Sequence, residues 1–401
     1  MIPKQVVWSA ERAIMRAVMA LSRRELVHTL GAVAGTSWLA RPAGAVSAPD
    51  VAATRAVHLS GDGVDLSPRD YASLLDELTR GGDIAADTYL LGGAIERFEQ
   101  HWATLLGKET AVFMPSGTLA NQLALRHLAG PKRRVIVPEM SHVYNDTGDA
   151  CQTLSGLTLM PLAPGAATFT RADVDAVLAR TAGGRVAVDV GAILIESPVR
   201  RLAGQMFDWE EAKRITAFAR ERGIGTHLDG ARLFIASAYT GISPAEYAAP
   251  FDTVYVSLWK YFNSGIGAIL AGPKRVLDGM FHVRRMFGGN LAIGWPAALI
   301  ARRYMDGFLD RFTSAVRVSE DFYTAIARHP KVTVTRIPNG TNLTRLTLKG
   351  VDVAAIRKTL LERHIEMPGG SPQDVVMLGV NETWNRTTGA DLARAFEQAL
   401  G

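Results

Sequence analysis

The chain has a single cysteine, Cys151, among 401 residues. One cysteine excludes an intrachain disulfide framework and any cysteine-rich zinc or iron–sulfur site, and it says nothing about the redox compartment. We interpret Cys151 as a small buried hydrophobic residue. Aromatic residues make up only 7% of the chain and charged residues 21%, beside 48% hydrophobic residues. These values lie near the average of globular proteins and argue against disorder, collagen-like repeats and a heptad rod.

A surplus of positive charge is also lacking once the first 48 residues are set aside. The formal net charge is +5, but residues 1–48 hold six basic and two acidic residues, which leaves 38 basic against 37 acidic residues. A nearly neutral remainder gives no electrostatic case for binding DNA or RNA. We therefore expect no nucleic-acid partner.

The N-terminal segment has the order of features typical of an export signal. Arg23 and Arg24 precede a weakly apolar stretch at residues 28–39, and two small-residue cleavage motifs end at Ala45 and Ala48. This order resembles a twin-arginine signal, which addresses bacterial proteins exported in the folded state. We expect a periplasmic protein, cleaved after Ala45 or Ala48; the alternative is an ordinary amphipathic helix on a cytoplasmic protein. The apolar stretch is shorter than the roughly 20 residues of a spanning helix, so no stable membrane insertion is expected.

From about residue 69 the apolar residues alternate between helical spacing and short buried runs. Helices are predicted at residues 69–80, 94–106, 118–129, 171–181 and 208–222. Strands are predicted at residues 111–114, 135–137, 192–195, 226–228, 254–257 and 268–271. This alternation indicates a mostly parallel sheet covered by helices on both faces.

The pattern changes after Gly289. Residues 293–329 keep a helical period, and we expect one long helix with Pro296 near its start, where proline is tolerated. Strands at 332–336, 344–348 and 375–380 and helices at 353–363 and 390–400 then form a small α+β unit. The predicted divisions are a signal at 1–48, an N-terminal arm and helix at 49–92, a large domain at 93–292, and a connecting helix with a small C-terminal domain at 293–401.

Ligands of open parallel sheets bind beyond the carboxyl ends of the strands, so reactive residues that follow strands are the candidates. The first group is Ser116, Gly117 and Thr118. Backbone N–H groups at a helix start, with two hydroxyls, can bind a phosphate, although such a serine can also be only an N-cap. The second candidate is His142, which can stack on a planar cofactor or move a proton near neutral pH; the alternative is a structural histidine.

Two further candidates follow the next strands. Asp229 ends one strand and Arg232 comes three residues later, so together they can hold a protonated ring nitrogen and a nearby anion, or else form a structural ion pair. Ser257 and Lys260 end another strand before a glycine-rich return. A lysine desolvated there has a lowered pKa and can form a Schiff base, whereas an exposed loop lysine would not.

These four sites together are the parts that pyridoxal phosphate requires: a phosphate cradle, a stacking imidazole, an acid for the ring nitrogen and a Schiff-base lysine. Their order along the chain is that of the aspartate-aminotransferase-like fold of such enzymes, fold type I. We therefore predict an α/β protein with a large cofactor-binding domain on a mostly parallel sheet and a small α+β C-terminal domain.

Four segments, at residues 114–121, 227–234, 257–260 and 285–289, resemble the threonine aldolase family, which is grouped with the β-eliminating lyases. The similarity extends over roughly residues 58–400. The resemblance implies that Lys260 forms the Schiff base, that Asp229 faces the pyridine nitrogen and that His142 stacks on the ring. It implies that the phosphate is bound by Ser116, Gly117, Thr118 and Ser257. It also implies that Arg232 lies beside the cofactor and substrate and that Arg285 lies near a dimer interface.

Several positions depart from the family pattern. Val199 stands where the family has a histidine near the substrate hydroxyl, and Met377 where it has an arginine for the substrate carboxylate. Losing such a carboxylate clamp costs a few kcal/mol unless Arg200, Arg201 or Arg284 replaces it. Other departures are Ala292 in place of an arginine and Gly61-Asp62-Gly63 in place of a Ser-Asp-Thr run, while Glu196 matches a family glutamate.

The resemblance implies a lyase that cleaves the Cα–Cβ bond of a β-hydroxy-α-amino acid to glycine and an aldehyde, with His142 as the remaining candidate base. It also implies a homodimer or homotetramer. The departures keep open β-elimination, racemisation or another reaction at Cα. An exported binding protein that only retains the fold is the alternative of another class.

Overall fold

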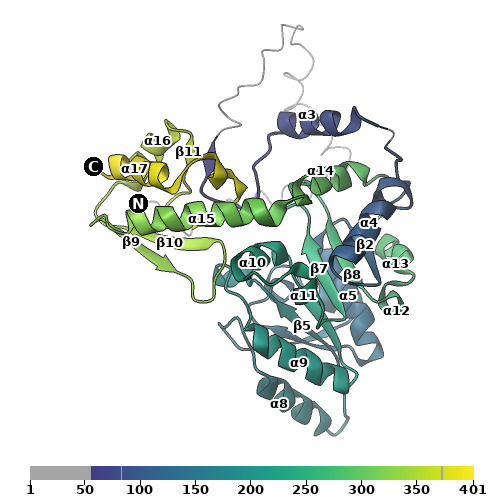
Figure 1. The fold of residues 1–401 in the computed structure, drawn as a ribbon. Coiled ribbons are helices and arrows are strands. Elements are labelled where there is room, and N and C mark those ends of the chain that lie inside the picture. The colour runs from purple at the N-terminus through teal and green to yellow at the C-terminus, as the bar shows by residue number, and fades with distance from the viewer. Residues whose placement is uncertain (1–55, 83, 372–373) are drawn as a thin grey trace, which may run out of the picture. The chain divides into compact units, whose positions relative to one another are not determined.

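The computed structural model of the chain describes residues 56–401 except residues 83, 372 and 373 (Figure 1). The predicted export signal, with its paired arginines and both cleavage motifs, lies outside these residues. Among the described residues, no helix is both long and apolar enough to cross a bilayer. The described chain begins with strand β1 (Val57–His58) and helix α3 (Pro68–Thr79).

A seven-stranded sheet has the strand order β2-β8-β7-β6-β5-β3-β4. Strand β8 is antiparallel to both neighbours, and the other pairs are parallel, so the predicted mostly parallel sheet is confirmed. The strands are β2 (Thr110–Met114), β3 (Arg134–Pro138), β4 (Thr158–Leu162), β5 (Val190–Glu196), β6 (Gly225–Asp229), β7 (Thr253–Ser257) and β8 (Ala268–Gly272).

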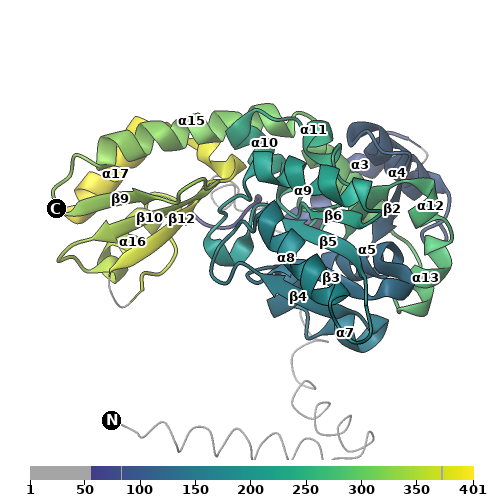
Figure 2. The same cartoon turned by 90° about the horizontal axis from the view of Figure 1, so that it is seen from below.

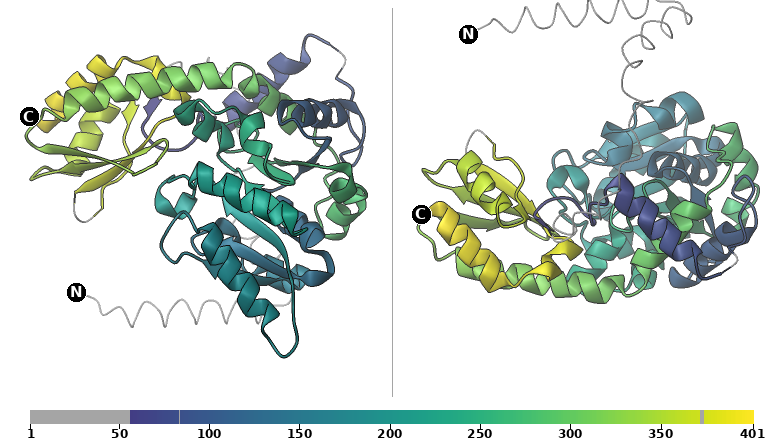
Figure 3. Two further views of the ribbon diagram at one scale, coloured as in Figure 1. Left: turned by 60° about the horizontal axis from the view of Figure 1, so that its bottom comes forward. Right: turned by 90° about the horizontal axis from the view of Figure 1, so that it is seen from above.

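Helices cover both faces of this sheet. Ile193 and Ile195 of β5 belong to the core under α8 (Arg171–Ala182), α9 (Trp209–Glu221) and α10 (Leu233–Thr240). Ala192 and Leu194 belong to the core under α5 (Gly117–Ala129). Figure 2 and Figure 3 show the strands between these two helical layers. Burial on both faces explains why the strands read as continuous apolar runs. Cys151 is buried, as expected.

Capping side chains fix where several of these helices begin. Thr170 and Asp173 form a reciprocal capping box at the start of α8, and Asp208 caps α9 by accepting from the Glu211 backbone N–H. The helices around the sheet include α4 (Gly93–Leu105), α5 (Gly117–Ala129), α6 (His142–Asn145), α7 (Ala150–Ser155), α8 (Arg171–Ala182), α9 (Trp209–Glu221), α10 (Leu233–Thr240), α11 (Pro244–Ala248), α12 (Lys274–Leu277) and α13 (Met280–Met286), with 3₁₀ turns η2 (Gly130–Lys132) and η3 (Arg200–Leu202).

The C-terminal part has its own core, formed by a three-stranded antiparallel sheet in the order β12-β10-β9 and by helices on one side of it (Figure 1). A short parallel pair, β1 with β11, adjoins it. The elements are α15 (Phe308–Ile326), β9 (Val332–Arg336), β10 (Leu343–Leu348), α16 (Val353–Leu361), β11 (Ile365–Glu366), β12 (Val375–Gly379), η4 (Glu382–Arg386) and α17 (Gly389–Leu400).

Two predictions about the elements were incomplete. The helix expected at 293–329 is divided into α14 (Trp295–Met305) and α15, because Gly307 between them has a φ of 69°, which is incompatible with a continuous right-handed helix. Strand β4 was not predicted, since it lies at the edge of the sheet and contains Pro161. The described residues from 56 onward form one compact unit, and the division at 292/293 stays a prediction.

Candidate active site

The carboxyl ends of β3, β5, β6 and β7 meet at one edge of the large sheet, because these strands run parallel. Glu196, the last residue of β5, is the register partner of Asp229, the last residue of β6. His142 begins α6 after β3, and Lys260 follows the end of β7. The charge of Asp229 acts on both His142 and Lys260. The structure therefore brings the three predicted catalytic residues together.

Lys260 is partly buried just beyond β7. Burial, and after it the Arg232 guanidinium, lower the pKa of Lys260 to about 8, against the opposite effect of Asp229. Its Nζ lies 5.6 Å from the centroid of the half-exposed Trp259 ring. An amine with this pKa has a substantial neutral fraction near physiological pH, which a Schiff-base nucleophile needs. Lys260 is thus distinct from an ordinary exposed lysine.

Asp229 is buried and hydrogen-bonded through both carboxylate oxygens. Asn121 of α5 donates from Nδ2 to Asp229 Oδ2 at 2.6 Å, and the Ala231 backbone N–H donates to Oδ1 at 3.1 Å. The other end of the Asn121 amide contacts His227 Nε2 at 2.8 Å, and His227 Nδ1 contacts Thr253 Oγ1 at 2.8 Å. Burial lowers the pKa of His227 to about 4, so its ring is neutral. A neutral ring donates from Nε2 to Asn121 and accepts from Thr253, which fixes the amide that holds Asp229.

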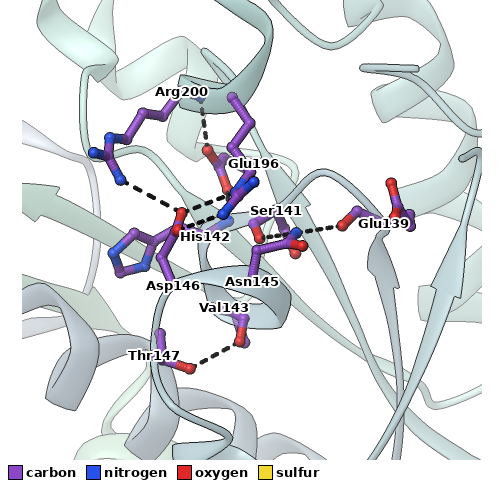
Figure 4. A network of polar contacts seen from close by, with 10 residues as sticks. Glu139, Ser141, His142, Val143, Asn145, Asp146, Thr147, Glu196 and Arg200 are labelled. Carbon is purple, nitrogen blue, oxygen red and sulfur yellow. Dashed lines mark hydrogen bonds and ion pairs between the residues drawn. The ribbon is translucent and has the colours of Figure 1, made fainter. Parts of the chain in front are cut away.

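Glu196 supports the backbone on which His142 and Arg200 stand (Figure 4). Its Oε2 accepts from the His142 backbone N–H at 2.6 Å, and its Oε1 accepts from the Arg200 backbone N–H at 3.0 Å. Burial and the nearby Asp229 charge raise the pKa of Glu196 above its usual range. Burial also lowers the pKa of His142, so its imidazole is mainly neutral at neutral pH and can accept a proton.

The N-terminus of α5 provides the predicted anion site. Ser116 is the N-cap, and its Oγ accepts from the Leu119 backbone N–H at 3.3 Å. Gly117 follows, and a Cβ built there would lie 1.9 Å from Tyr255 Oη, so only glycine fits against this ring. The nearby end of β7 contributes Ser257, whose buried Oγ forms no hydrogen bond of normal geometry. Free N–H groups of a helix start and an unpaired buried hydroxyl are the features that a phosphate group satisfies.

Arg232 forms an ion pair with Asp62 and not with Asp229. Its Nε and one terminal nitrogen donate to the same Asp62 oxygen at 2.9 Å and 2.8 Å. The other Asp62 oxygen accepts from Asn342 Nδ2 at 3.3 Å. A segment before α3, the start of α10 and the start of β10 therefore meet at Arg232. The alternative of a structural ion pair between Asp229 and Arg232 does not apply, because Arg232 pairs with Asp62.

Arg285 and Val199 are the two other positions that the family pattern singles out. Arg285 is exposed on α13, with its guanidinium 5.3 Å from the centroid of the Tyr89 ring. It forms no hydrogen bond or ion pair with the other predicted site residues in the described part of the chain. Its place near a dimer interface stays a prediction. Val199, which stands where the family pattern has a histidine, is fully buried.

Sequence reasoning missed the residues that hold the candidate residues in place. Asn121 and His227 orient Asp229, while Asp62 and Asn342 hold Arg232. One of them had a usable signal: His227 lies two residues before Asp229 on the same strand, so both side chains point to the same face of the sheet. Asp62 and Asn342 are separated by 280 residues, and no local pattern connects them.

The residues present fit pyridoxal phosphate. The start of α5 and the unpaired Ser257 hydroxyl suit its phosphate, the buried Asp229 carboxylate suits its ring nitrogen, and the Lys260 amine suits its aldehyde. These groups lie at neighbouring strand ends, as one flat cofactor requires. The predicted cofactor is therefore compatible with the geometry.

Comparisons with known proteins agree with this arrangement. The family model described as beta-eliminating lyase matches residues 82–360. The low specificity L-threonine aldolase of Saccharomyces cerevisiae is 28% identical over 280 residues, which cover 68% of this chain and 71% of that protein. The low-specificity L-threonine aldolase of Candida albicans is 33% identical over 198 residues, 49% of this chain and 52% of that protein. The alignment thus spans about half the length of the second relative.

A solved structure extends the similarity over nearly the whole described chain. A Listeria monocytogenes protein assigned as an L-allo-threonine aldolase superposes with a TM-score of 0.70 at 28% identity, covering 87% of this chain and 98% of that chain. The predicted fold class is confirmed by this match.

Proposed function

The chain belongs to the beta-eliminating lyase family of pyridoxal-phosphate enzymes, and on that premise we propose that it cleaves the Cα–Cβ bond of a β-hydroxy-α-amino acid to glycine and an aldehyde. The observation that carries the proposal is the meeting of Lys260, Asp229 and His142 at one sheet edge, beside the anion site of α5. This set combines an amine, an acid and a base at neighbouring strand ends.

When bound, pyridoxal phosphate supplies the electron sink that makes cleavage of the Cα–Cβ bond feasible. Lys260 would hold the cofactor covalently, and its lowered pKa favours the neutral amine that bond formation needs. Asp229, fixed by Asn121 and the Ala231 backbone N–H, would keep the ring nitrogen protonated by offering it a negative charge. Ser116, Gly117, Thr118 and Ser257 would bind the phosphate.

His142 is the candidate for removing the proton of the β-hydroxyl. Its ring is half-buried and its pKa is lowered, so one ring nitrogen is free to accept a proton at neutral pH. Val199 has no titratable group, and the charges of Asp229 and Lys260 both act on His142, which leaves His142 as the candidate base. Transfer can be direct or through a water molecule.

The test is incubation of the purified holoenzyme with the stereoisomers of threonine and phenylserine, followed by assay of glycine and aldehyde. We expect both products from at least one isomer, and none from Lys260→Ala. Formation of pyruvate and ammonia, or deuterium exchange at Cα without cleavage, would instead identify the elimination or racemisation chemistry that the substituted positions leave open. Absence of any reaction with every isomer would reject the proposal.

We also propose export through the twin-arginine route. The support is the sequence of residues 22–48, with Arg23 and Arg24 ahead of a mild apolar stretch and two small-residue motifs. Fusion of residues 1–48 to a reporter that is active only after folded export tests it. We expect export of the fusion and its loss in Arg23→Lys/Arg24→Lys; equal export of both would contradict the route.

We further propose that the enzyme works as a homodimer or homotetramer. The support is a set of large apolar side chains that are about half exposed or more in the single chain: Tyr89, Leu91, Met286 and Ile293. Arg285 lies over the first of these. Sedimentation of the holoenzyme tests the proposal, and a monomer at micromolar concentration would contradict it.

A further inference from the structure

A small cavity adjoins the candidate active site and is lined by two arginines. Its volume is about 180 Å³, and its walls include Asp62, Arg200, Arg232 and Asn342. The cavity adjoins Lys260, because Gly61 and Asp62 line both this cavity and the neighbouring pocket that Lys260 lines. An amino-acid substrate attached through its amine near Lys260 must place its α-carboxylate a few ångströms away, so a neighbouring cationic cavity is the natural receptor for it.

The two arginines differ in how far other groups already occupy them. Arg232 donates twice to Asp62, at 2.9 Å and 2.8 Å, so one edge of its guanidinium is used inside the protein. Arg200 has one long contact, a hydrogen bond from its Nη1 to Asp146 Oδ2 at 3.4 Å. That same oxygen already accepts from Arg201 Nε at 3.2 Å, and the other Asp146 oxygen accepts from Arg201 Nη2 at 2.8 Å. Asp146 is therefore the partner of Arg201, and Arg200 is the less committed cation.

The backbone of Arg200 is anchored, whereas its side chain makes only the long contact with Asp146. The Glu196 carboxylate accepts from the Arg200 backbone N–H, and the same carboxylate accepts from the His142 backbone N–H. Figure 4 shows this shared anchor, with the Arg200 side chain extending toward Asp146. The guanidinium charge also reaches His142. Arg200 thus begins η3, shortly after Glu196 at the end of β5, with about half of its side chain exposed.

Arg284 and Arg201 are not available to bind a substrate carboxylate. Arg284 is buried at 2% exposure and donates to the Phe113 carbonyl, where it is part of the packing around β2. Arg201 is held in two-point contact with Asp146. Of the three arginines that could replace a missing carboxylate clamp, only Arg200 lines the cavity.

We propose that Arg200 binds the α-carboxylate of the amino-acid substrate, in the cavity that it shares with Arg232. The planar guanidinium offers two parallel N–H donors to a carboxylate, and the long contact with Asp146 is given up because Arg201 still neutralises that acid. The inference rests on the proposed function, since it requires an amino acid as the ligand. Arg200 is a binding and specificity residue, and it takes no part in bond cleavage.

The test compares glycine with glycinamide, which has the same amine but no carboxylate, as ligands of the holoenzyme in equilibrium titrations. In Arg200→Gln we expect glycine to bind about 10- to 100-fold more weakly, as for loss of a charged two-point contact, while glycinamide binding is unchanged. Arg200→Lys keeps the charge but loses the fork, and an intermediate preference is expected. Arg201→Lys is the matched control, since it alters the neighbouring arginine but keeps a cation beside Asp146, so that Arg200 can still leave that acid, and it should keep the wild-type preference.

The outcomes separate this inference from the proposed function. If the wild type binds glycine and Arg200→Gln keeps the full preference over glycinamide, the carboxylate role is wrong while the proposed function stands. If Arg201→Lys loses the preference to the same extent, the effect belongs to the Asp146 cluster and the role is again wrong. If the wild type binds neither ligand, the proposed function itself fails.

Discussion

Replacing Asn121 with alanine tests whether the acid at the end of β6 is held for cofactor binding. The Asn121 amide donates to Asp229 Oδ2 at 2.6 Å and accepts from His227 Nε2 at 2.8 Å. All three side chains are buried, so no water replaces the lost amide without rearrangement. The substitution leaves Asp229 with the Ala231 backbone N–H as its remaining donor and leaves a buried imidazole N–H without an acceptor.

The magnitude follows from the charge on Asp229. A hydrogen bond to a charged group contributes about 1.5–3 kcal/mol, which corresponds to about 10- to 100-fold in an equilibrium constant. We therefore expect Asn121→Ala to weaken binding of pyridoxal phosphate to the apoenzyme by about that factor, because Asp229 is less firmly placed opposite the ring nitrogen. The measurement is a titration of apoenzyme with cofactor, followed by absorbance.

The control is Gln122→Ala. Gln122 neighbours Asn121 on α5 and is equally buried, but its amide donates to the Ala150 carbonyl and to Ser155 Oγ, both at 3.3 Å. Its removal should lower stability without changing cofactor affinity. Equal cofactor affinities for the two variants would refute the reasoning.

Three further predictions concern Lys260, Gly117 and Val199. With the pKa of Lys260 lowered to about 8, capture of pyridoxal phosphate by apoenzyme should accelerate about tenfold from pH 7 to pH 9 and then level off, in stopped-flow absorbance; a rise that continues beyond pH 10 would contradict burial of the amine. Gly117→Ala places a Cβ 1.9 Å from Tyr255 Oη and should destabilise the protein by about 1–3 kcal/mol in urea denaturation, unlike Gly81→Ala, which meets open space. Val199→His puts a polar ring into a fully buried position and should cost about 1–3 kcal/mol without raising activity, and an aldolase rate above wild type would show otherwise.

The sequence predicted the large sheet well because its strands are short apolar runs between helices with clear periodicity. The residues after those runs, such as His142 and Lys260, could be predicted as a group because parallel strands direct their ends to the same edge. Edge strand β4 and the break at Gly307 were missed, since partial exposure weakens the apolar pattern and a single glycine is a weak signal in a helical stretch.

The part of the site that sequence could not supply depends on long-range contacts. Asp62 and Arg232 are 170 residues apart, and nothing near either residue indicates that they pair. The same holds for Arg200. It makes only one long contact with Asp146 because the adjacent Arg201 binds both oxygens of that acid, and the sequence does not indicate which of the two arginines does so. Local patterns report which residue types are present, whereas the allocation of partners is decided by the folded chain.

The junction of Asp62, Arg232 and Asn342 has a consequence for biosynthesis. It joins a segment that leaves the ribosome early to one that leaves it late, with the large sheet in between. A growing chain that has completed the large sheet still lacks Asn342. The ion pair between Arg232 and Asp62 is then without the hydrogen bond that Asn342 donates to Asp62. The contact that completes this junction, from Asn342 to Asp62, is therefore added only late in synthesis, after the cofactor cradle.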